Sequence, residues 1–234
     1  AARLYKLAVD QGHAFAQAID LLRKFSPAAP GWQLGEMYLV EAYIENLAAE
    51  HYCNGLVFST VVDGAEVYGA PMTVTAAFNR ALAHADSGLA LVTGTTADDI
   101  KIRSALQVTK GRILLNLDNP AQAASAVSGV ASSFQYLELH AITTTSNQYW
   151  NLGNVAGRYS VSNNEGVNGL NFATANDPRL PVCAGGDVAC KAIGVTKTTR
   201  DDLTGPYYVQ RMWPARESSV PIIAGIEARL IERG

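Results

Sequence analysis

The stretch "ALQVTKGRILLNLDNPAQAASAVSGV", residues 105–130, gives the clearest indication of how this chain folds. It predicts a pair of helices, 98–117 and 120–130, on either side of the polar turn "NLDNP". Pro120 suits the first turn of the second helix, because the N–H that proline lacks has no partner at that position. The stretch therefore predicts a helical hairpin, and the fold expected for the chain is mainly α.

The rest of the first 130 residues follows the same pattern. Gly12 is expected to break the first helix, and Thr73 or Thr75 is expected to cap the third. The segment 56–73 is rich in Val, Phe, Gly and Pro, and predicts extended or looping chain. The further helices are expected at 1–25, 32–52 and 75–92.

After residue 130 the helical pattern fades, and Asn, Ser, Thr, Gly and aromatic residues dominate until residue 218. Only the last segment, "SVPIIAGIEARLIERG", predicts another helix, at 219–234. The late region has few apolar residues in periodic order, so we expect it to lack a core of its own and to pack on the helices. One domain is expected over 1–234, with a helical scaffold at 1–130, a loop-rich, ligand-facing region at 131–218 and a terminal helix.

The bulk composition excludes several classes of protein. The chain has 234 residues, of which 48% are hydrophobic and 17% charged, and its net charge is −3. This composition can form a sizeable core and argues against disorder. The mild acidity and the absence of a Lys/Arg cluster argue against a nucleic-acid partner. No apolar run approaches the roughly 20 residues that cross a bilayer, so no membrane span is expected.

The chain has three cysteines, Cys53, Cys183 and Cys190. The last two stand close together in a loop that contains glycine, where they either form a small disulfide ring or remain free thiols. A zinc site is a poor alternative, because the spacing is wrong and no histidine lies nearby in the sequence. A disulfide would indicate an oxidising compartment.

Two stretches resemble helical repeats. The hairpin at 105–130 resembles a tetratricopeptide repeat, with small Gly111 and Ala123 where the helices approach and Leu114, Leu115 and Leu117 filling the groove. The opening "AARLYKLAVDQGHAFAQ" resembles the related Sel1-type repeat, through Ala2, Tyr5, Ala8, Gly12, Ala16 and Gln17. An ordinary α-hairpin accounts for either pattern as well, because any tight helix pair needs small residues at its contact.

The order of the segments resembles that of the SusD/RagB family of bacterial surface nutrient-binding lipoproteins, over roughly residues 18–233. The family's "DPR" passage matches Asp177, Pro178 and Arg179, and "PIIAGIEARLIE" matches a later segment, with Gly225 near where the family has an arginine. Pro30 and Gly31 separate the first two expected helices.

The resemblance implies tetratricopeptide-like helix pairs that carry long ligand-binding loops. It also implies a place at the cell surface, in the outer membrane, where the protein captures a glycan, an oligosaccharide or another small nutrient. The partner implied is a TonB-dependent, SusC-like transporter, and the family's lipid-anchoring cysteine would precede residue 1. The chain starts directly in helix without Met, so we expect a fragment or a processed chain.

No catalytic, cofactor or metal motif is recognisable, and the chain is not expected to be an enzyme. The paired acids at 98–99 and 201–202 suit helix starts or loops better than a catalytic centre. His51, beside Glu50, suits the C-terminal end of a helix. Catalysis by this chain would need acids that lie far apart in the sequence to converge on one cleft.

Aromatic and amide residues gather in the late loops "SNQYWNLGN" and "GPYYVQRMWPAR". A flat aromatic ring can stack on the C–H face of a sugar while amides and arginine bond its hydroxyls. Alternatively, such rings pin a long loop to its scaffold, or the chain is a helical-repeat adaptor for a protein or peptide. The candidate ligand-binding residues are Asn147, Tyr149, Trp150, Tyr207, Tyr208, Arg211 and Trp213.

Overall fold

The computed structural model describes residues 2–62, 65–166, 168–200 and 205–233. The chain is mainly α-helical, as expected, and its contacts divide it into two compact units. The first unit consists of Ala1–Tyr136 together with Ile222–Gly234, and the second, Leu137–Pro221, is inserted between these two parts. The sequence had indicated one domain over the same span.

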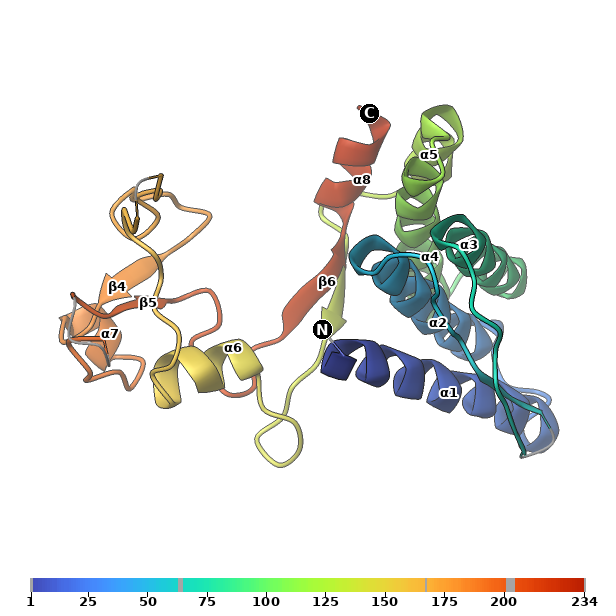
Figure 1. Ribbon diagram of the computed structural model, residues 1–234, viewed down its shortest axis with the longest axis horizontal. Helices are drawn as coiled ribbons and strands as arrows, with labels where there is room; N and C mark the ends of the chain where they lie inside the picture. Colours follow the sequence, from blue (N-terminus) through green and yellow to red (C-terminus); the bar gives the residue numbers. More distant parts are fainter. Residues whose placement is uncertain (1, 63–64, 167, 201–204, 234) are drawn as a thin grey trace. The chain divides into compact units, whose positions relative to one another are not determined.

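Five helices form most of the first unit, and each packs against the next along the chain, while α2 also packs against α4 (Figure 1). The predicted break at Gly12 is wrong, since α1 passes through it. A glycine inside a helix costs only about 1 kcal/mol, which the contacts of the surrounding turns can offset. The helices are α1 (Ala2–Phe25), α2 (Gly31–His51), α3 (Val74–Leu91), α4 (Ala97–Asn116) and α5 (Pro120–Val127).

Local signals fix where these helices begin. The Thr73 hydroxyl caps α3 by accepting a hydrogen bond from the backbone N–H of Ala76 at 3.1 Å. Helix α4 begins with a capping box, in which Thr96 Oγ1 accepts from the Asp99 N–H and the Asp99 carboxylate accepts from the Thr96 N–H. Pro120 occupies the first turn of α5, as predicted.

The close approach of α4 and α5 occurs at Gly111, as the sequence predicted. A Cβ atom at this glycine would lie 2.5 Å from the Val127 side chain and 3.4 Å from the Ala123 carbonyl oxygen. Ala123 itself is fully buried. Glycine at this position therefore lets the two helix backbones come together.

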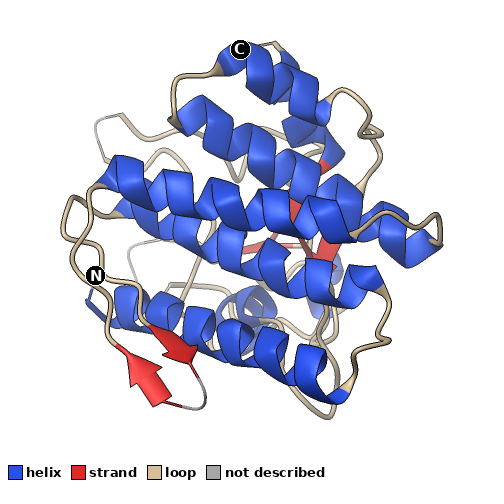
Figure 2. Ribbon diagram, turned by 90° about the vertical axis from the view of Figure 1, so that its right-hand side faces the viewer, coloured by secondary structure: helices blue, strands red, loops and turns tan. Residues whose placement is uncertain are grey.

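The segment between α2 and α3 is extended, as predicted. Strands β1 (Thr60–Val62) and β2 (Ala65–Val67) pair antiparallel, and a further bridge joins Leu56 to Met72. The β1–β2 pair is visible as two short arrows in Figure 2, and β1 contacts α1. This hairpin brings β1 to the surface of the helices near α1.

Strand β6 (Val220–Ala224) leads directly into α8 (Gly225–Glu232), so the helix predicted over 219–234 begins later than expected. The β-branched residues before Gly225 and the N–H missing from Pro221 favour extended chain. Strand β6 pairs with β3 (Gln135–Glu138), and α8 packs against α4 and α5. The C-terminal segment thus completes the first unit.

The interior of the first unit consists of two clusters of buried apolar residues. One is formed by α4, α5, β6 and α8 together with Leu39 of α2, and the other by α2, α3, Ile113 of α4 and the chain just before β1. The largest buried side chains of the two clusters are those of Leu39, Leu56, Phe58, Phe78, Ile102, Leu106, Ile113, Leu114, Ile223 and Ile231.

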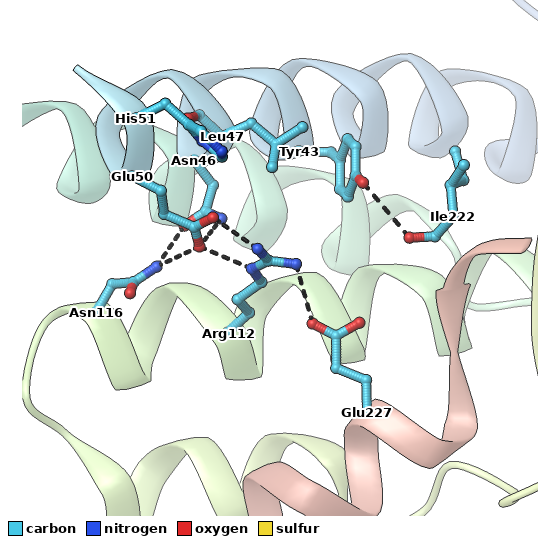
Figure 3. A network of polar contacts seen from close by, with 9 residues as sticks. All are labelled: Tyr43, Asn46, Leu47, Glu50, His51, Arg112, Asn116, Ile222 and Glu227. Atoms are coloured by element: carbon cyan, nitrogen blue, oxygen red, sulfur yellow. Dashed lines mark hydrogen bonds and ion pairs between the residues drawn. The ribbon is translucent and has the colours of Figure 1, made fainter. Parts of the chain in front are cut away.

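A polar network ties α2, α4 and α8 together beside this core (Figure 3). Arg112 on α4 bonds the Glu50 carboxylate of α2 and also contacts Glu227 of α8, at 3.3 Å. Asn116 donates a further hydrogen bond to Glu50 at 2.8 Å. Burial raises the pKa of Glu227, although the charge of Arg112 opposes this. The network therefore links α2, α4 and α8 through side-chain hydrogen bonds and ion pairs.

The second unit is mostly loop, with short elements that surround a disulfide. The predicted bond joins Cys183 to Cys190, and Cys53 is a free, exposed thiol. Both bonded cysteines belong to a small buried cluster, so the expectation that this region has no core is wrong. The elements are α6 (Gln148–Trp150), the π-helical turn η1 (Asn151–Val155), β4 (Val182–Ala184), α7 (Val188–Lys191) and β5 (Tyr208–Gln210). The cluster consists of Cys183, Cys190, Val195, Tyr207 and Val209.

Candidate functional site

Two of the residues predicted to bind a ligand form a stacked aromatic pair in the second unit. The rings of Tyr149 and Trp213 lie 4.7 Å apart between centroids, at an interplanar angle of 28°. Tyr149 remains 57% exposed although it stacks on Trp213, which is half-buried. The Tyr149 side chain is therefore accessible to solvent while its ring packs against Trp213.

Asn147 holds Tyr149 in place and is not itself a surface residue. It is fully buried, and its side-chain oxygen caps α6 by accepting a hydrogen bond from the Trp150 N–H at 3.0 Å. Its amide nitrogen donates to the carbonyl oxygen of Ser218 at 2.7 Å. The prediction that Asn147 binds a ligand is corrected to a positioning role, because its amide group is occupied within the chain.

Hydrogen bonds within the chain also stabilise the loop that carries Trp213. The Trp213 N–H donates to the side-chain oxygen of Gln210 at 2.9 Å, and the Gln210 amide donates to the Trp213 carbonyl oxygen at 3.2 Å. Gln210 is the last residue of β5, which pairs with β4 next to the disulfide. The aromatic pair is thus anchored from both of its chain segments, which reduces the entropy that ligand binding costs.

Tyr207 is a core residue, which overturns its assignment to the ligand surface. Its side chain is 1% exposed, and its hydroxyl contacts the carbonyl oxygens of Gly153 and Tyr159. Tyr208, the next residue and the first of β5, is half-buried, and successive side chains of extended chain point to opposite faces. No signal in "GPYYVQ" alone separates the buried tyrosine from its neighbour.

The remaining candidates lie close to the pair in sequence. Trp150 is half-buried beside Tyr149 on α6, and Arg211 is exposed two residues before Trp213. Gln148 is exposed, and within the described residues its side chain makes only long hydrogen bonds, at 3.4 Å to the Ser146 carbonyl oxygen and 3.4 Å to the Asn151 amide. These weak bonds leave the Gln148 amide able to exchange them for a ligand.

A second candidate site, which the sequence analysis missed, lies in the first unit. It is an open groove of about 1060 Å³ between α1, α2, α3 and β1. Its wall combines apolar residues with charged ones on all three helices. The main lining residues are Ile19, Asp20, Leu21, Arg23, Lys24, Tyr38, Glu41, Val62, Arg80 and His84.

Glu41 and His84 are the ionisable residues at the base of this groove. His84 Nδ1 lies 3.0 Å from a carboxylate oxygen of Glu45 and 3.8 Å from one of Glu41. Arg80 Nε donates to the other oxygen of Glu45 at 2.6 Å. Arg80 and Glu45 together therefore orient the His84 ring, and the Glu41 carboxyl group has no hydrogen-bond partner within the described chain.

Burial and neighbouring charges shift the proton affinities of these groups. Burial raises the pKa of Glu41 to about 7, although the nearby His84 opposes the shift. Burial by itself would lower the pKa of His84, but its hydrogen bond to Glu45 and the charges of Glu45 and Glu41 raise it above the usual value. At neutral pH Glu41 is therefore poised between its two protonation states.

The signal for this groove was present in the sequence as two pairs at helical spacing. Glu41 and Glu45 stand four residues apart on α2, and Arg80 and His84 stand four apart on α3. Residues at this spacing lie on one face of a helix, so two such pairs on neighbouring helices can converge. The pairing of α2 with α3 had to be known before the signal could be used.

The other acids and histidines have local roles. Asp99 belongs to the capping box, Asp98 pairs with Lys101 at 2.8 Å, and the pair at 201–202 lies outside the described residues. His51 is the last residue of α2, and its Nδ1 lies 2.9 Å from the Leu47 carbonyl oxygen. Among the described residues, no cluster of three or more His, Cys, Asp or Glu side chains is placed to hold a metal ion.

The "DPR" passage forms a closed local pair. Arg179 Nη2 lies 2.6 Å from an oxygen of Asp177, and this hydrogen bond lowers the pKa of Asp177 to about 2. Arg179 is otherwise exposed and bonds within its own turn. The passage thus stabilises a turn.

In the part of the chain that the structure describes, no helix combines the length and apolar character needed to span a bilayer. Comparison with family models, with curated proteins and with solved structures gives no significant match to this chain.

Proposed function

We propose that this chain is a cell-surface glycan-binding protein of the SusD/RagB type. The observation that supports the proposal best is the Tyr149–Trp213 pair, whose exposed face is of the kind that stacks on the apolar face of a sugar ring. In this proposal the helices of the first unit are tetratricopeptide-like pairs that serve as scaffold. The captured nutrient passes to a TonB-dependent, SusC-like transporter in the outer membrane, and the chain catalyses no reaction.

The surroundings of the pair suit recognition of hydroxyl groups. Gln148, the residue before Tyr149, offers an exposed amide, and Arg211 offers a guanidinium with no side-chain partner in the described chain. Amide and guanidinium groups can bond the hydroxyls at the edge of a sugar whose C–H face lies on the aromatic ring.

Screening the protein on a glycan array and titrating the best oligosaccharide by tryptophan fluorescence tests this proposal. Tyr149→Ala and Trp213→Ala are each expected to weaken binding by roughly tenfold or more. The matched control is Trp32→Phe, which changes a half-buried tryptophan of the first unit and should leave the affinity unchanged. Absence of any glycan ligand, or equal binding by all three variants, would exclude the aromatic pair as the site.

A second candidate function is that of a helical-repeat adaptor for a protein or peptide. It is favoured by Ile226 and Leu230, which stand one turn apart on α8 and are 63% and 69% exposed. Exposed apolar side chains at helical spacing are typical of a protein-binding surface. Co-purification of a partner that Ile226→Ser with Leu230→Ser releases, without any glycan response, would favour the adaptor.

A further inference from the structure

We propose that the groove between α1, α2, α3 and β1 is a separate ligand site, which binds a small organic carboxylate with an apolar body. The site lies within the first unit and does not depend on the glycan-binding proposal. It is argued from the cations, the acid and the apolar residues that line the groove.

The rim of the groove carries positive charge that no carboxylate of the described chain neutralises. Arg23 donates one hydrogen bond to the Tyr38 hydroxyl, at 2.8 Å, and its guanidinium lies 5.9 Å from the centre of the same ring. Lys24 has only a contact with the Phe25 ring, at 5.3 Å. Within the described residues neither cation forms an ion pair. Arg23 therefore keeps guanidinium N–H groups for an anionic ligand, and can bind a carboxylate through two of them.

Glu41 offers a hydrogen-bond donor in the same groove. The Glu41 side chain is 8% exposed and lines the groove, and its carboxyl group has no partner closer than His84. Because its pKa is about 7, a modest gain from a ligand keeps Glu41 protonated at neutral pH. A protonated carboxyl group donates its proton to a ligand carboxylate, which an ionised one repels.

His84 is a second donor at this position. Its Nδ1 faces Glu45, so the other ring nitrogen, Nε2, has no hydrogen-bond partner in the described part of the chain. When His84 is protonated, Nε2–H can donate to a ligand, and the fixed ring orientation reduces the entropy that this costs. Arg80, by contrast, is occupied by Glu45.

The walls suit an apolar body attached to the carboxylate. Leu21 of α1 and Val62 of β1 are exposed apolar residues of the lining, and Ile19 of α1 is a buried one. The ring of Tyr38 adds an aromatic surface next to Arg23. A volume of about 1060 Å³ accommodates a ring system of one or two rings with solvent to spare.

The balance of charge favours an anion over a cation. Asp20 and Glu41 are the acids among the described lining residues, and they stand against Arg23 and Lys24, because Arg80 and His84 are paired with Glu45. Glu45 lies behind the lining and is neutralised by Arg80 and His84. Because Glu41 is partly protonated at neutral pH, Arg23 and Lys24 outweigh the two acids, and the lining favours an anion.

The groups that face Glu41 determine how binding depends on pH. They are Asp20 on α1, Glu45 on α2, and Arg80 and His84 on α3. An anion stabilises the protonated forms of Glu41 and His84, so affinity is expected to fall as pH rises through about 7. A one-unit rise of the Glu41 pKa on binding, from about 7, corresponds to a loss of roughly fivefold in affinity between pH 6 and pH 8.

The experiment uses the full chain and two probes of the same shape, 2-naphthoate and the uncharged 2-naphthamide. Probe fluorescence anisotropy at pH 6 and pH 8 measures their affinities. We expect 2-naphthoate to bind roughly tenfold tighter than 2-naphthamide at pH 6, and this preference to shrink at pH 8. Glu41→Gln should retain binding and reduce the dependence on pH, because Gln donates at both values and only the contribution of His84 remains.

The double variant Arg23→Met with Lys24→Met should lower the affinity for 2-naphthoate by roughly tenfold or more and leave 2-naphthamide unaffected. Both side chains are exposed, so the variant should fold, and its far-UV circular dichroism verifies this. Trp213→Ala, in the other unit, should change neither probe. Equal affinity for the two probes, no binding of 2-naphthoate, or an unchanged double variant would overturn the proposal, whatever the glycan titration shows.

Discussion

Arg112 and Glu50 form a two-pronged ion pair between α4 and α2, in which Nε and Nη2 lie 2.7 and 2.6 Å from the two carboxylate oxygens. The pair lowers the pKa of Glu50 through hydrogen bonds from Arg112, Asn116 and Asn46, which outweigh the opposing effect of burial. Glu227 of α8 shares the same guanidinium. Arg112 of α4 thus links α2 to the C-terminal helix, α8.

Replacing Arg112 by Met should destabilise the first unit. The Glu50 carboxylate would keep its partial burial and lose its cation, at a cost of about 2 kcal/mol once the exposure of Arg112 is allowed for. Urea denaturation followed by circular dichroism at 222 nm measures the change, because the long helices lie in this unit. Since the folded pKa of Glu50 lies below 4.5, this stabilisation is present above pH 4.5 and is lost as pH falls through the folded pKa.

The matched control is Lys110→Met on the same helix. Lys110 pairs with Asp86 at 2.6 Å, and Asp86 is about half exposed, so the loss should be less than about 0.5 kcal/mol. Equal effects of the two substitutions would show that the Arg112 network contributes no more than a surface pair.

Glu41→Gln should make the first unit more stable at pH 8. The folded pKa of Glu41 is about 7 and lies above the ordinary value of 4.5, so the folded state holds its proton more tightly. Stability is therefore greatest below pH 4.5 and falls as pH rises through about 7, by on the order of 3 kcal/mol. Gln has no proton to lose, so the variant should gain at pH 8 and match the wild type near pH 5. If the free energies of unfolding of the two proteins change with pH in the same way, burial does not raise the pKa of Glu41.

Gly111→Ala should destabilise the contact of α4 with α5. The new methyl group would meet the Val127 side chain at 2.5 Å, and overpacking of this kind costs about 1–3 kcal/mol. Ala favours a helix by about 1 kcal/mol over Gly, which offsets part of this loss. Gly129→Ala is the control, since nothing lies within 4 Å of a Cβ atom at that position. A gain in thermal stability for Gly111→Ala would show that the helices separate easily there.

Replacing both Cys183 and Cys190 by Ala should loosen the second unit alone. The bond closes a ring over a separation of 7 residues, and loss of this constraint costs about 2.5 kcal/mol in the chain-entropy model. Native-state hydrogen exchange resolves the two units, and amides of β5 should lose protection while those of α4 keep theirs. Cys53→Ala, at an exposed free thiol, should change neither.

Local signals in the sequence were sufficient for most of the first unit. The cap at Thr73, the proline at the start of α5 and the small residue at Gly111 each act within one or two turns, so their effects could be predicted without knowledge of the fold. Gly12 failed as a signal because a helix with enough favourable neighbours tolerates one glycine. The residues of β6 were misassigned because strand formation depends on a partner, β3, that is remote in the sequence.

The candidate sites were harder to predict for the same reason. Tyr149 and Trp213 were identified by residue type, but only the structure shows that they stack, and that Tyr207 turns inward. The groove around Glu41 and His84 depends on the packing of three helices and a strand. Burial, which shifts the pKa of Glu41, is a property of that packing and has no signature in the residue itself.

The insertion of Leu137–Pro221 into the first unit affects the order in which the protein can fold during its synthesis. Helix α8 packs against α4 and α5, yet the ribosome makes it only after the whole inserted segment has emerged. Until then, Arg112 lacks one of its two acidic neighbours and the apolar side of α5 stays open to water. The first unit of the nascent chain therefore stays incomplete while the inserted segment is translated. During this period chaperones can bind the exposed apolar residues.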